Sequence, residues 1–204
     1  MQNAKILPQT AVVWPHFAAK ESSDRDLLGK IAARDRLAMR TLYGRHHVRV
    51  YRFVLRLVGD EFKAEDIVSE VFFDVWRQAG RFEGRSQVST WILAIARYKA
   101  ISLVRQRQDE QLDQDFAEGM VDPADDAQQT LEKRDTSIQL QKCLQQLSAE
   151  HREIIDLVYY HEKSVEEAAV IVGVPPSTVK TRMFYARKRI SELFARAGER
   201  AVRH

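Results

Sequence analysis

An acidic run that contains no basic residue divides this chain into two parts. Between Asp109 and Asp126 there is not one Lys or Arg, and Gly119 and Pro123 interrupt regular structure. The acidic residues of the run are Asp109, Glu110, Asp113, Asp115, Glu118, Asp122, Asp125 and Asp126. This composition is typical of a linker. We therefore expect an extension at residues 1–22, a domain at 23–107, a linker at 108–130 and a second domain at 131–204. The acidic run is either a solvated tether or a segment that lies in a basic channel built for nucleic acid.

Apolar residues recur at helical spacing on both sides of the linker. In the first part, Leu27, Leu28 and Ile31 begin the pattern behind Asp24, a candidate cap. Longer helices are expected at about 36–58, 63–76 and 89–107, the first of them stopped by Gly59. In the second part, helices are expected at about 135–147 and 148–160. The predicted fold class is all-α, with two small helical domains.

Charge and cysteine usage limit the possible functions. The net charge is only +3, so its distribution along the chain is more informative than its sum. The single cysteine, Cys143, excludes an intrachain disulfide and a cysteine-based metal site within one chain, which favours a reduced, cytoplasmic setting. Cys143 lies among leucines and is read as a small core residue rather than a redox group. Pro8 and Pro15 break the N-terminal segment, which has no apolar run typical of a signal peptide or a membrane span.

The segment 63–76 is predicted to have one apolar and one acidic face. Its apolar residues can pack inward, which leaves polar and charged residues and one aromatic ring outside. The outer residues are Glu65, Asp66, Ser69, Glu70, Phe73 and Arg77. Two interpretations remain open, a solvated face or a docking face for a basic partner. Acid-base catalysis is not indicated, because no nucleophile, metal-ligand set or glycine-rich phosphate loop accompanies the carboxylates.

An aromatic and basic stripe is predicted on the helix at 89–107. At about 100° per residue, Trp91, Tyr98, Ser102 and Arg105 fall along one edge, with Arg97 nearby. Aromatic rings interspersed with guanidinium groups are typical of surfaces that stack unpaired bases and bind phosphates. The alternative is that the rings are partly buried core residues, which is common at this spacing.

The C-terminal part contains a helix-turn-helix pattern. Ser164 and Glu167 form a capping box for a short apolar helix, Gly173 permits a tight turn, and Pro175 and Pro176 precede a basic helix. On that helix, hydroxyl and aromatic residues share a face bordered by cations, which suits the major groove of duplex DNA. A solvated basic helix is the alternative. The exposed residues of this candidate reader are Ser177, Thr178, Lys180, Thr181, Arg182, Phe184, Tyr185, Arg187 and Lys188.

Four sequence blocks in this order resemble the extracytoplasmic-function group of bacterial sigma factors of the sigma-70 family. The blocks are YRFVLRLVGD at 51–60, AEDIVSEVFFDVW at 64–76, STWILAIARYKAISLVR at 89–105, and LSAEHREIIDLVYY at 147–160 followed by VGVPPSTVKTRMFYARKRI. A helix-turn-helix alone would be weak support. The combination, split by an acidic linker, is specific.

The resemblance implies a promoter-recognition subunit of RNA polymerase that has no catalytic activity or cofactor of its own. The outer face at 65–77 would dock on the clamp coiled coil of core polymerase. The loop at 85–89 and the helix behind it would melt and capture the −10 element on the non-template strand. The residues implied at the −10 element are Arg85, Ser86, Gln87, Val88, Ser89, Trp91, Arg97, Tyr98, Ser102 and Arg105. The helix-turn-helix would read the −35 element as duplex and rest on the polymerase flap.

The resemblance also implies a route for the linker and a regulator. The acidic linker would thread toward the active-site and RNA-exit channel, and an anti-sigma factor would hold the protein inactive. Three positions depart from the family pattern, because Tyr98 stands where Asn is usual, Ser102 where Asp or Asn is usual, and Ser177 where Gly is usual. Tyr98 offers stacking and one hydroxyl instead of an amide, which leaves the −10 base preference open.

A free-standing DNA-binding regulator is the alternative from another functional class. Such a protein would use only the C-terminal helix-turn-helix, with the first domain as a sensor or a dimerisation unit. The docking face and the aromatic stripe favour the sigma factor, because a duplex-only repressor has no use for a single-strand platform. No metal site is expected, since His46 and His47 point to different faces and His151 and His161 do not share a side.

Overall fold

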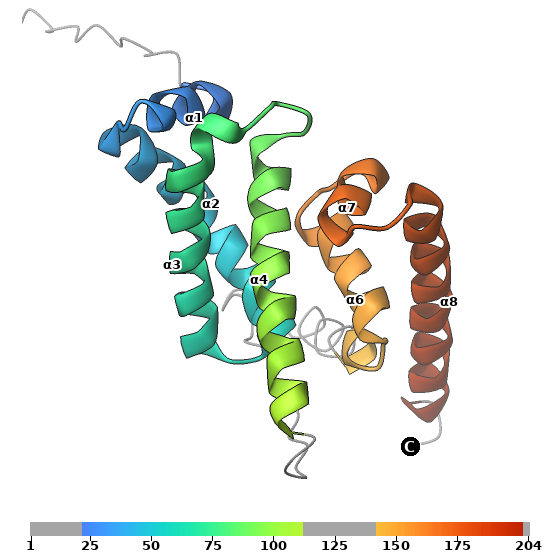
Figure 1. The fold of residues 1–204 in the computed structure, drawn as a ribbon. Coiled ribbons are helices and arrows are strands. Elements are labelled where there is room, and N and C mark those ends of the chain that lie inside the picture. The colour runs from blue at the N-terminus through green and yellow to red at the C-terminus, as the bar shows by residue number, and fades with distance from the viewer. Residues whose placement is uncertain (1–21, 112–141, 202–204) are drawn as a thin grey trace, which may run out of the picture.

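A computed structural model describes residues 22–111 and 142–201, and within them the chain forms helices and no strand (Figure 1). The helices of the N-terminal domain are α1 (Asp24–Ala32), α2 (Arg36–Val58), α3 (Glu61–Gln78), the 3₁₀ helix η1 (Ala79–Arg81) and α4 (Val88–Gln111). Those of the C-terminal domain are α6 (Ala149–Ile155), the π-helical turn η2 (Asp156–Tyr160), α7 (Val165–Val172) and α8 (Pro176–Ala201). The all-α prediction is confirmed.

Side-chain caps and one glycine set the helix ends of the N-terminal domain. The expected cap at Asp24 is wrong, because Ser23 caps α1 through a capping box with Asp26, and Asp24 is the first helical residue. Asp24 is free for other contacts as a result. Asp60 caps α3, and Gly59 ends α2 in the left-handed conformation with φ of 68°, a conformation in which glycine carries no steric cost.

The predicted turn chemistry of the C-terminal domain is confirmed. Ser148 caps α6, and Ser164 and Glu167 form the capping box of α7. Gly173 has a φ of 73° and ends α7, and α8 begins at Pro176 as expected. Most of the helix expected at 135–147 lies outside the described residues, although 142–145 are helical and Cys143 is buried there. This is the position expected for a small core residue.

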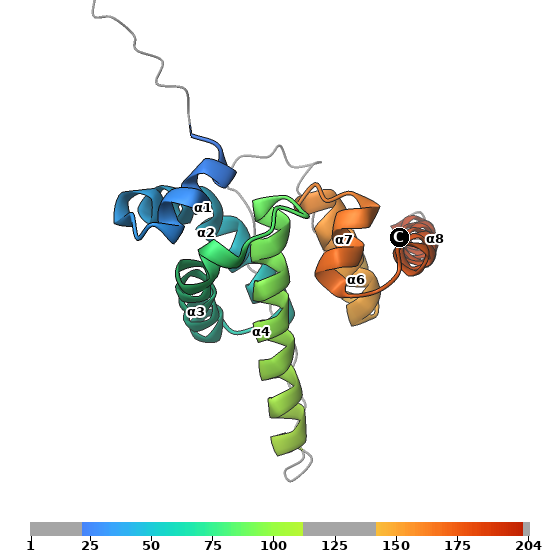
Figure 2. The same cartoon turned by 45° about the horizontal axis from the view of Figure 1, so that its top comes forward.

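The two domains pack directly against each other. α4 lies beside α7 in both views (Figures 1 and 2), and buried residues of both domains form one continuous apolar cluster. Phe53 and Ile92 contribute from the first domain, and Leu157 and Ala168 from the second. The sequence pattern predicted two helical domains, and it contained no sign of this contact. The linker expected at 108–130 falls mostly outside the described residues, because α4 continues to Gln111 and the description resumes at residue 142.

Within residues 22–111 and 142–201, none of the helices combines the length and apolarity that a membrane crossing needs. In the same ranges, no group of three or more potential ligands lies close enough to hold a metal ion.

Candidate nucleic-acid interface

The outer face of α3 is solvent-exposed, as predicted. Its six candidate residues, Glu65, Asp66, Ser69, Glu70, Phe73 and Arg77, are all exposed. The ring of Phe73 is 59% exposed, and the guanidinium of Arg77 lies 5.6 Å from its centroid. Phe62, one turn before Asp66 and 83% exposed, extends the apolar part of this face. Phe62 was not among the predicted residues because it precedes the predicted helix start at 63.

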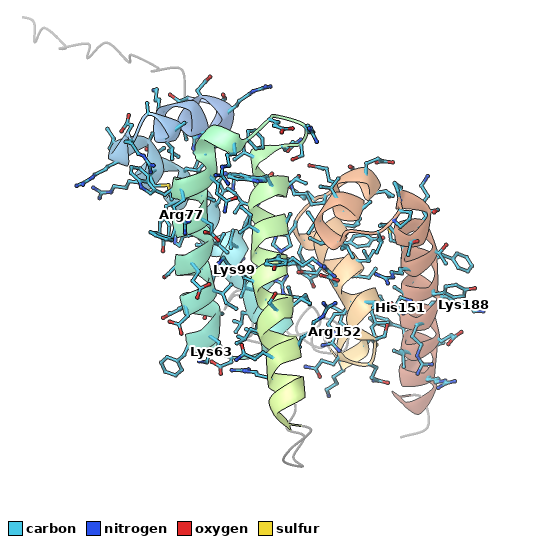
Figure 3. The ribbon with its side chains drawn as sticks, in the orientation of Figure 1. Lys63, Arg77, Lys99, His151, Arg152 and Lys188 are labelled. Atoms are coloured by element: carbon cyan, nitrogen blue, oxygen red, sulfur yellow. The ribbon has the colours of Figure 1, made fainter. Side chains whose placement is uncertain are left out.

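Lys99 ties the acidic face of α3 to α4. Its ammonium lies 3.0 Å from Glu70 and 2.9 Å from Asp74, between the two helices (Figure 3). Burial alone would lower the pKa of Lys99, but the hydrogen bonds to Asp74 and Glu70 outweigh it and raise the pKa above its ordinary value. Glu70 therefore has a structural role in addition to its predicted docking role.

The loop at 82–89 borders an open hollow of about 390 Å³. Its lining residues are Asp24, Arg25, Phe82, Gly84, Arg85, Ser86, Gln87, Val88 and Ser89. The predicted loop residues 85–89 therefore line one common space, in which Val88 is buried and Arg85 is exposed beside Glu83. The contribution of α1 to this hollow was not predicted, because no local sequence pattern links residues 24 and 25 to a loop about sixty positions away.

The α4 stripe is exposed at one end and partly buried at the other. Tyr98 is 75% exposed, and Ser102 and Arg105 are also exposed. Ser102 donates its hydroxyl hydrogen to the carbonyl oxygen of Tyr98 at 2.8 Å, the helix-internal bond that this side chain commonly makes. Trp91 is half-buried against Phe82, with ring centroids 5.3 Å apart. The core interpretation therefore holds for part of Trp91, and the ring of Tyr98 is free to stack.

Two residues predicted at the −10 element contact the C-terminal domain. Arg97 donates from Nε and Nη2 to the two carboxylate oxygens of Glu153, at 2.6 and 3.2 Å. The hydroxyl of Ser89 accepts a hydrogen bond from Lys163 Nζ at 2.6 Å. Their neighbour Thr90 donates to Glu167 at 2.6 Å. The structure thus brings the loop and the stripe together and places α6 and α7 against one side of them.

The exposed face of α8 is open to solvent. Phe184 and Tyr185 are 63% and 53% exposed, and their rings meet edge to face at 5.4 Å between centroids. Lys188 projects from the outer side of the helix (Figure 3). Thr181 donates its hydroxyl hydrogen to the Ser177 carbonyl at 3.0 Å. A face with rings and hydroxyls at its centre and cations at its edges can meet base edges and phosphates together.

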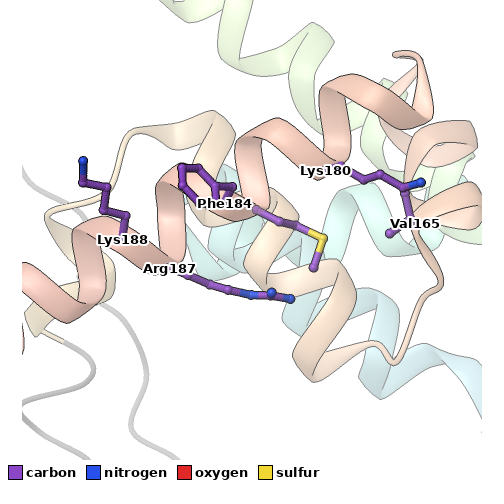
Figure 4. A pocket seen from close by; sticks show the side chains of 6 residues that line it. Val165, Lys180, Phe184, Arg187 and Lys188 are labelled. Atoms are coloured by element: carbon purple, nitrogen blue, oxygen red, sulfur yellow. The ribbon is translucent and has the colours of Figure 1, made fainter.

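A groove of about 540 Å³ runs beside the start of α8 (Figure 4). Its walls are Val165, Lys180, Met183, Phe184, Arg187 and Lys188. The accessible lining of the groove is mostly apolar, and Lys180, Arg187 and Lys188 place three cations around it. Ser177 is exposed and Thr178 is half-buried at the helix start.

Arg182 is turned away from the exposed face. Its guanidinium lies 2.9 Å from Glu150 of α6, and its side chain is only 18% exposed. Among the nine residues predicted at the −35 element, Arg182 is therefore placed between helices of the C-terminal domain. The rest of the set surrounds the exposed face and the groove.

Sequence comparison assigns both domains to one family. Residues 42–110 match the family described as Sigma-70 region 2, and residues 137–190 match Sigma-70, region 4. The ECF RNA polymerase sigma factor SigK of Mycobacterium bovis (strain BCG / Pasteur 1173P2) is 31% identical over 166 residues, which cover 79% of this chain and 89% of that protein. The SigK of Mycobacterium sp. (strain KMS) is 29% identical over 178 residues, covering 85% and 92%.

Solved structures show a similar arrangement of helices. The sigma factor RpoE from Bartonella quintana, solved in complex with the anti-sigma factor NepR, matches with a TM-score of 0.63 and 30% identity, over 76% of this chain and 96% of that one. CnrH, solved in complex with the cytosolic domain of CnrY, has the same fold, with a TM-score of 0.61 and 24% identity over 85% of this chain and 98% of that one. By sequence and by fold, the chain belongs to the extracytoplasmic-function group of the sigma-70 family of RNA polymerase sigma factors.

Proposed function

We propose that this sigma factor binds core RNA polymerase through the outer face of α3 and reads promoter DNA with two separate surfaces. α8 reads the −35 element as duplex. The 82–89 loop and the α4 stripe melt the −10 element and capture its non-template strand. The observation that carries this proposal is the exposed ring of Tyr98, 75% accessible on the same helix edge as Arg105, because a core residue would not be so exposed.

Chemistry at each surface supports the assignment. The hollow under the loop can receive a base removed from the stack, a step that costs a few kcal/mol. Stacking on Tyr98 and phosphate contacts from Arg105 are the terms that offset this cost. On α8, Lys180, Arg187 and Lys188 border the exposed rings and suit the phosphates of a duplex.

We also propose that an anti-sigma factor controls this protein in the cytoplasm, where the polymerase acts. RpoE, which is 30% identical to this chain, was solved with such a partner. The exposed Phe62 and Phe73 on α3 offer an apolar surface that either core polymerase or a competing protein can cover. One shared surface would make the two partners mutually exclusive.

Run-off transcription tests the main proposal. Purified chain added to core polymerase should give initiation at a specific promoter, selected from a genomic library. Substituting Phe73→Ala should weaken binding to core polymerase and leave −35 duplex binding by the free chain unchanged. If the chain bound duplex DNA and supported no initiation with core polymerase, the free-standing regulator would be the better assignment.

A further inference from the structure

The hollow under the 82–89 loop is completed by α1, which no predicted site includes. Both carboxylate oxygens of Asp24 already have a partner, because they accept hydrogen bonds from Arg45 Nη1 at 2.8 Å and from His46 Nε2 at 2.6 Å. Burial would raise the pKa of Asp24, but the hydrogen bonds from Arg45 and His46 outweigh it and hold the pKa below its usual value. Asp24 therefore fixes the start of α1 as a satisfied anion.

Arg25, the next residue of α1, lies against the backbone of the 82–89 loop. A Cβ atom at Gly84 would lie 2.5 Å from Arg25 Nη2 and 2.9 Å from Cζ, so the guanidinium lies directly against the loop backbone. Gly84 has a φ of 72°, which again favours glycine at this position. Within the described ranges, Arg25 makes no hydrogen bond or ion pair. The hollow is thus bordered by an exposed guanidinium whose donors have no protein partner within the described ranges.

We propose that Arg25 is a specificity-determining residue that reads the base captured by the loop; this rests on the proposed function. A guanidinium donates two parallel hydrogen bonds to paired acceptors. Guanine presents N7 and O6 side by side, and cytosine presents O2 and N3, whereas adenine and thymine have no adjacent pair of acceptors. Arg25 therefore selects guanine or cytosine at one position of the −10 element.

Selection from a random library tests this assignment. Holoenzyme made from core polymerase and the chain is incubated with fork-junction DNA whose non-template strand is randomised, and the retained strands are sequenced. We expect the wild-type chain to enrich guanine or cytosine at one position. Arg25→Ala should lose that enrichment while other positions keep theirs, and Arg25→Lys should behave like Arg25→Ala because an ammonium lacks the planar fork.

Lys30→Ala is the matched control, since it removes an exposed cation from the same helix without touching the hollow. It should keep the wild-type profile. Identical profiles for the wild type and Arg25→Ala, or a wild-type preference only for adenine or thymine, would overturn the role of Arg25 alone. If the wild-type holoenzyme enriched no sequence, the proposed function itself would fail.

Discussion

The two helices assigned to DNA differ in what covers them. α8 exposes Phe184, Tyr185 and its bordering cations to solvent along a single face. α4 exposes Tyr98 but contacts the C-terminal domain through Arg97. Under the proposed function, the duplex-reading surface is therefore exposed when the domains are packed together, whereas the strand-capturing surface is partly covered.

Under the proposed function, this difference corresponds to what each surface has to recognise. Duplex DNA is present before initiation, so a permanently exposed helix can read it without cost. A melted strand exists only in the promoter complex, and a permanently exposed platform of rings and cations would bind any single strand. In the structure, α6 and α7 cover part of α4, which reduces the area that is open to such unspecific binding.

The largest expected effect concerns the exposed side of the comparison. The double variant Arg187→Ala/Lys188→Ala should weaken −35 duplex binding by about tenfold or more at physiological salt, because two phosphate contacts are lost. The slope of log affinity against log salt should become shallower by about 0.9 for each contact. Duplex binding measured at several salt concentrations gives both values.

Arg182→Ala serves as the comparison variant for this measurement. Arg182 pairs with Glu150 inside the domain, so its loss should leave the salt slope unchanged. An equal change in slope for Arg182→Ala would mean that the exposed face of α8 does not define the duplex contact.

A smaller effect is expected within α4 itself. Trp91→Ala should lower the free energy of unfolding by about 2 kcal/mol, less than the loss of a fully buried Trp, because Trp91 is only half-buried against Phe82. Tyr98→Ala should change it by about 0.5 kcal/mol at most, since its ring is exposed. Urea denaturation measures both values.

Promoter assays separate stability from function for these two variants. Both Trp91→Ala and Tyr98→Ala should reduce open-complex formation more than closed-complex binding. A loss of stability in Tyr98→Ala as large as that in Trp91→Ala would assign the whole α4 stripe to the core.

The smallest effect concerns the pH dependence of the domain contact. Burial would raise the pKa of Glu167, but hydrogen bonds from Thr90, the Ser164 backbone and Lys163 outweigh it and lower the pKa. A carboxyl whose pKa is lowered by folding contributes stability above its unfolded pKa and loses it as the pH falls through the folded value. The packing of the two domains against each other should therefore loosen as the pH falls below about 4.

The radius of gyration from small-angle X-ray scattering between pH 6 and pH 3 measures this loosening. In Glu167→Gln, the radius of gyration should change less between pH 6 and pH 3 than in the wild type. Asp24 and Asp60, whose pKa values are also lowered, still destabilise the fold of this variant in acid. No difference between Glu167→Gln and wild type would show that this carboxyl does not couple the domains.

Local patterns predicted much of the fold. α2 begins and ends where its apolar spacing and Gly59 indicate, and the capping box of Ser164 and Glu167 starts α7. The outer face of α3 and the exposed face of α8 also agree with the angular positions of their residues. The cap of α1 was missed, because both Ser23 and Asp24 are common caps and only the backbone conformation distinguishes them.

By itself, the sequence determined which residues form helices, which face of each helix is apolar and, with the exception of Arg182, which side chains α8 presents. Helical periodicity and capping act over a few residues, so they are readable from the sequence. Tertiary structure alone decided that Arg25 lies under the loop and that Arg97 meets Glu153, 56 positions later. Those contacts depend on how whole helices pack, and one exposed Arg resembles another in a sequence. Only packing separates the guanidinium that is free to bind from the one that is already paired.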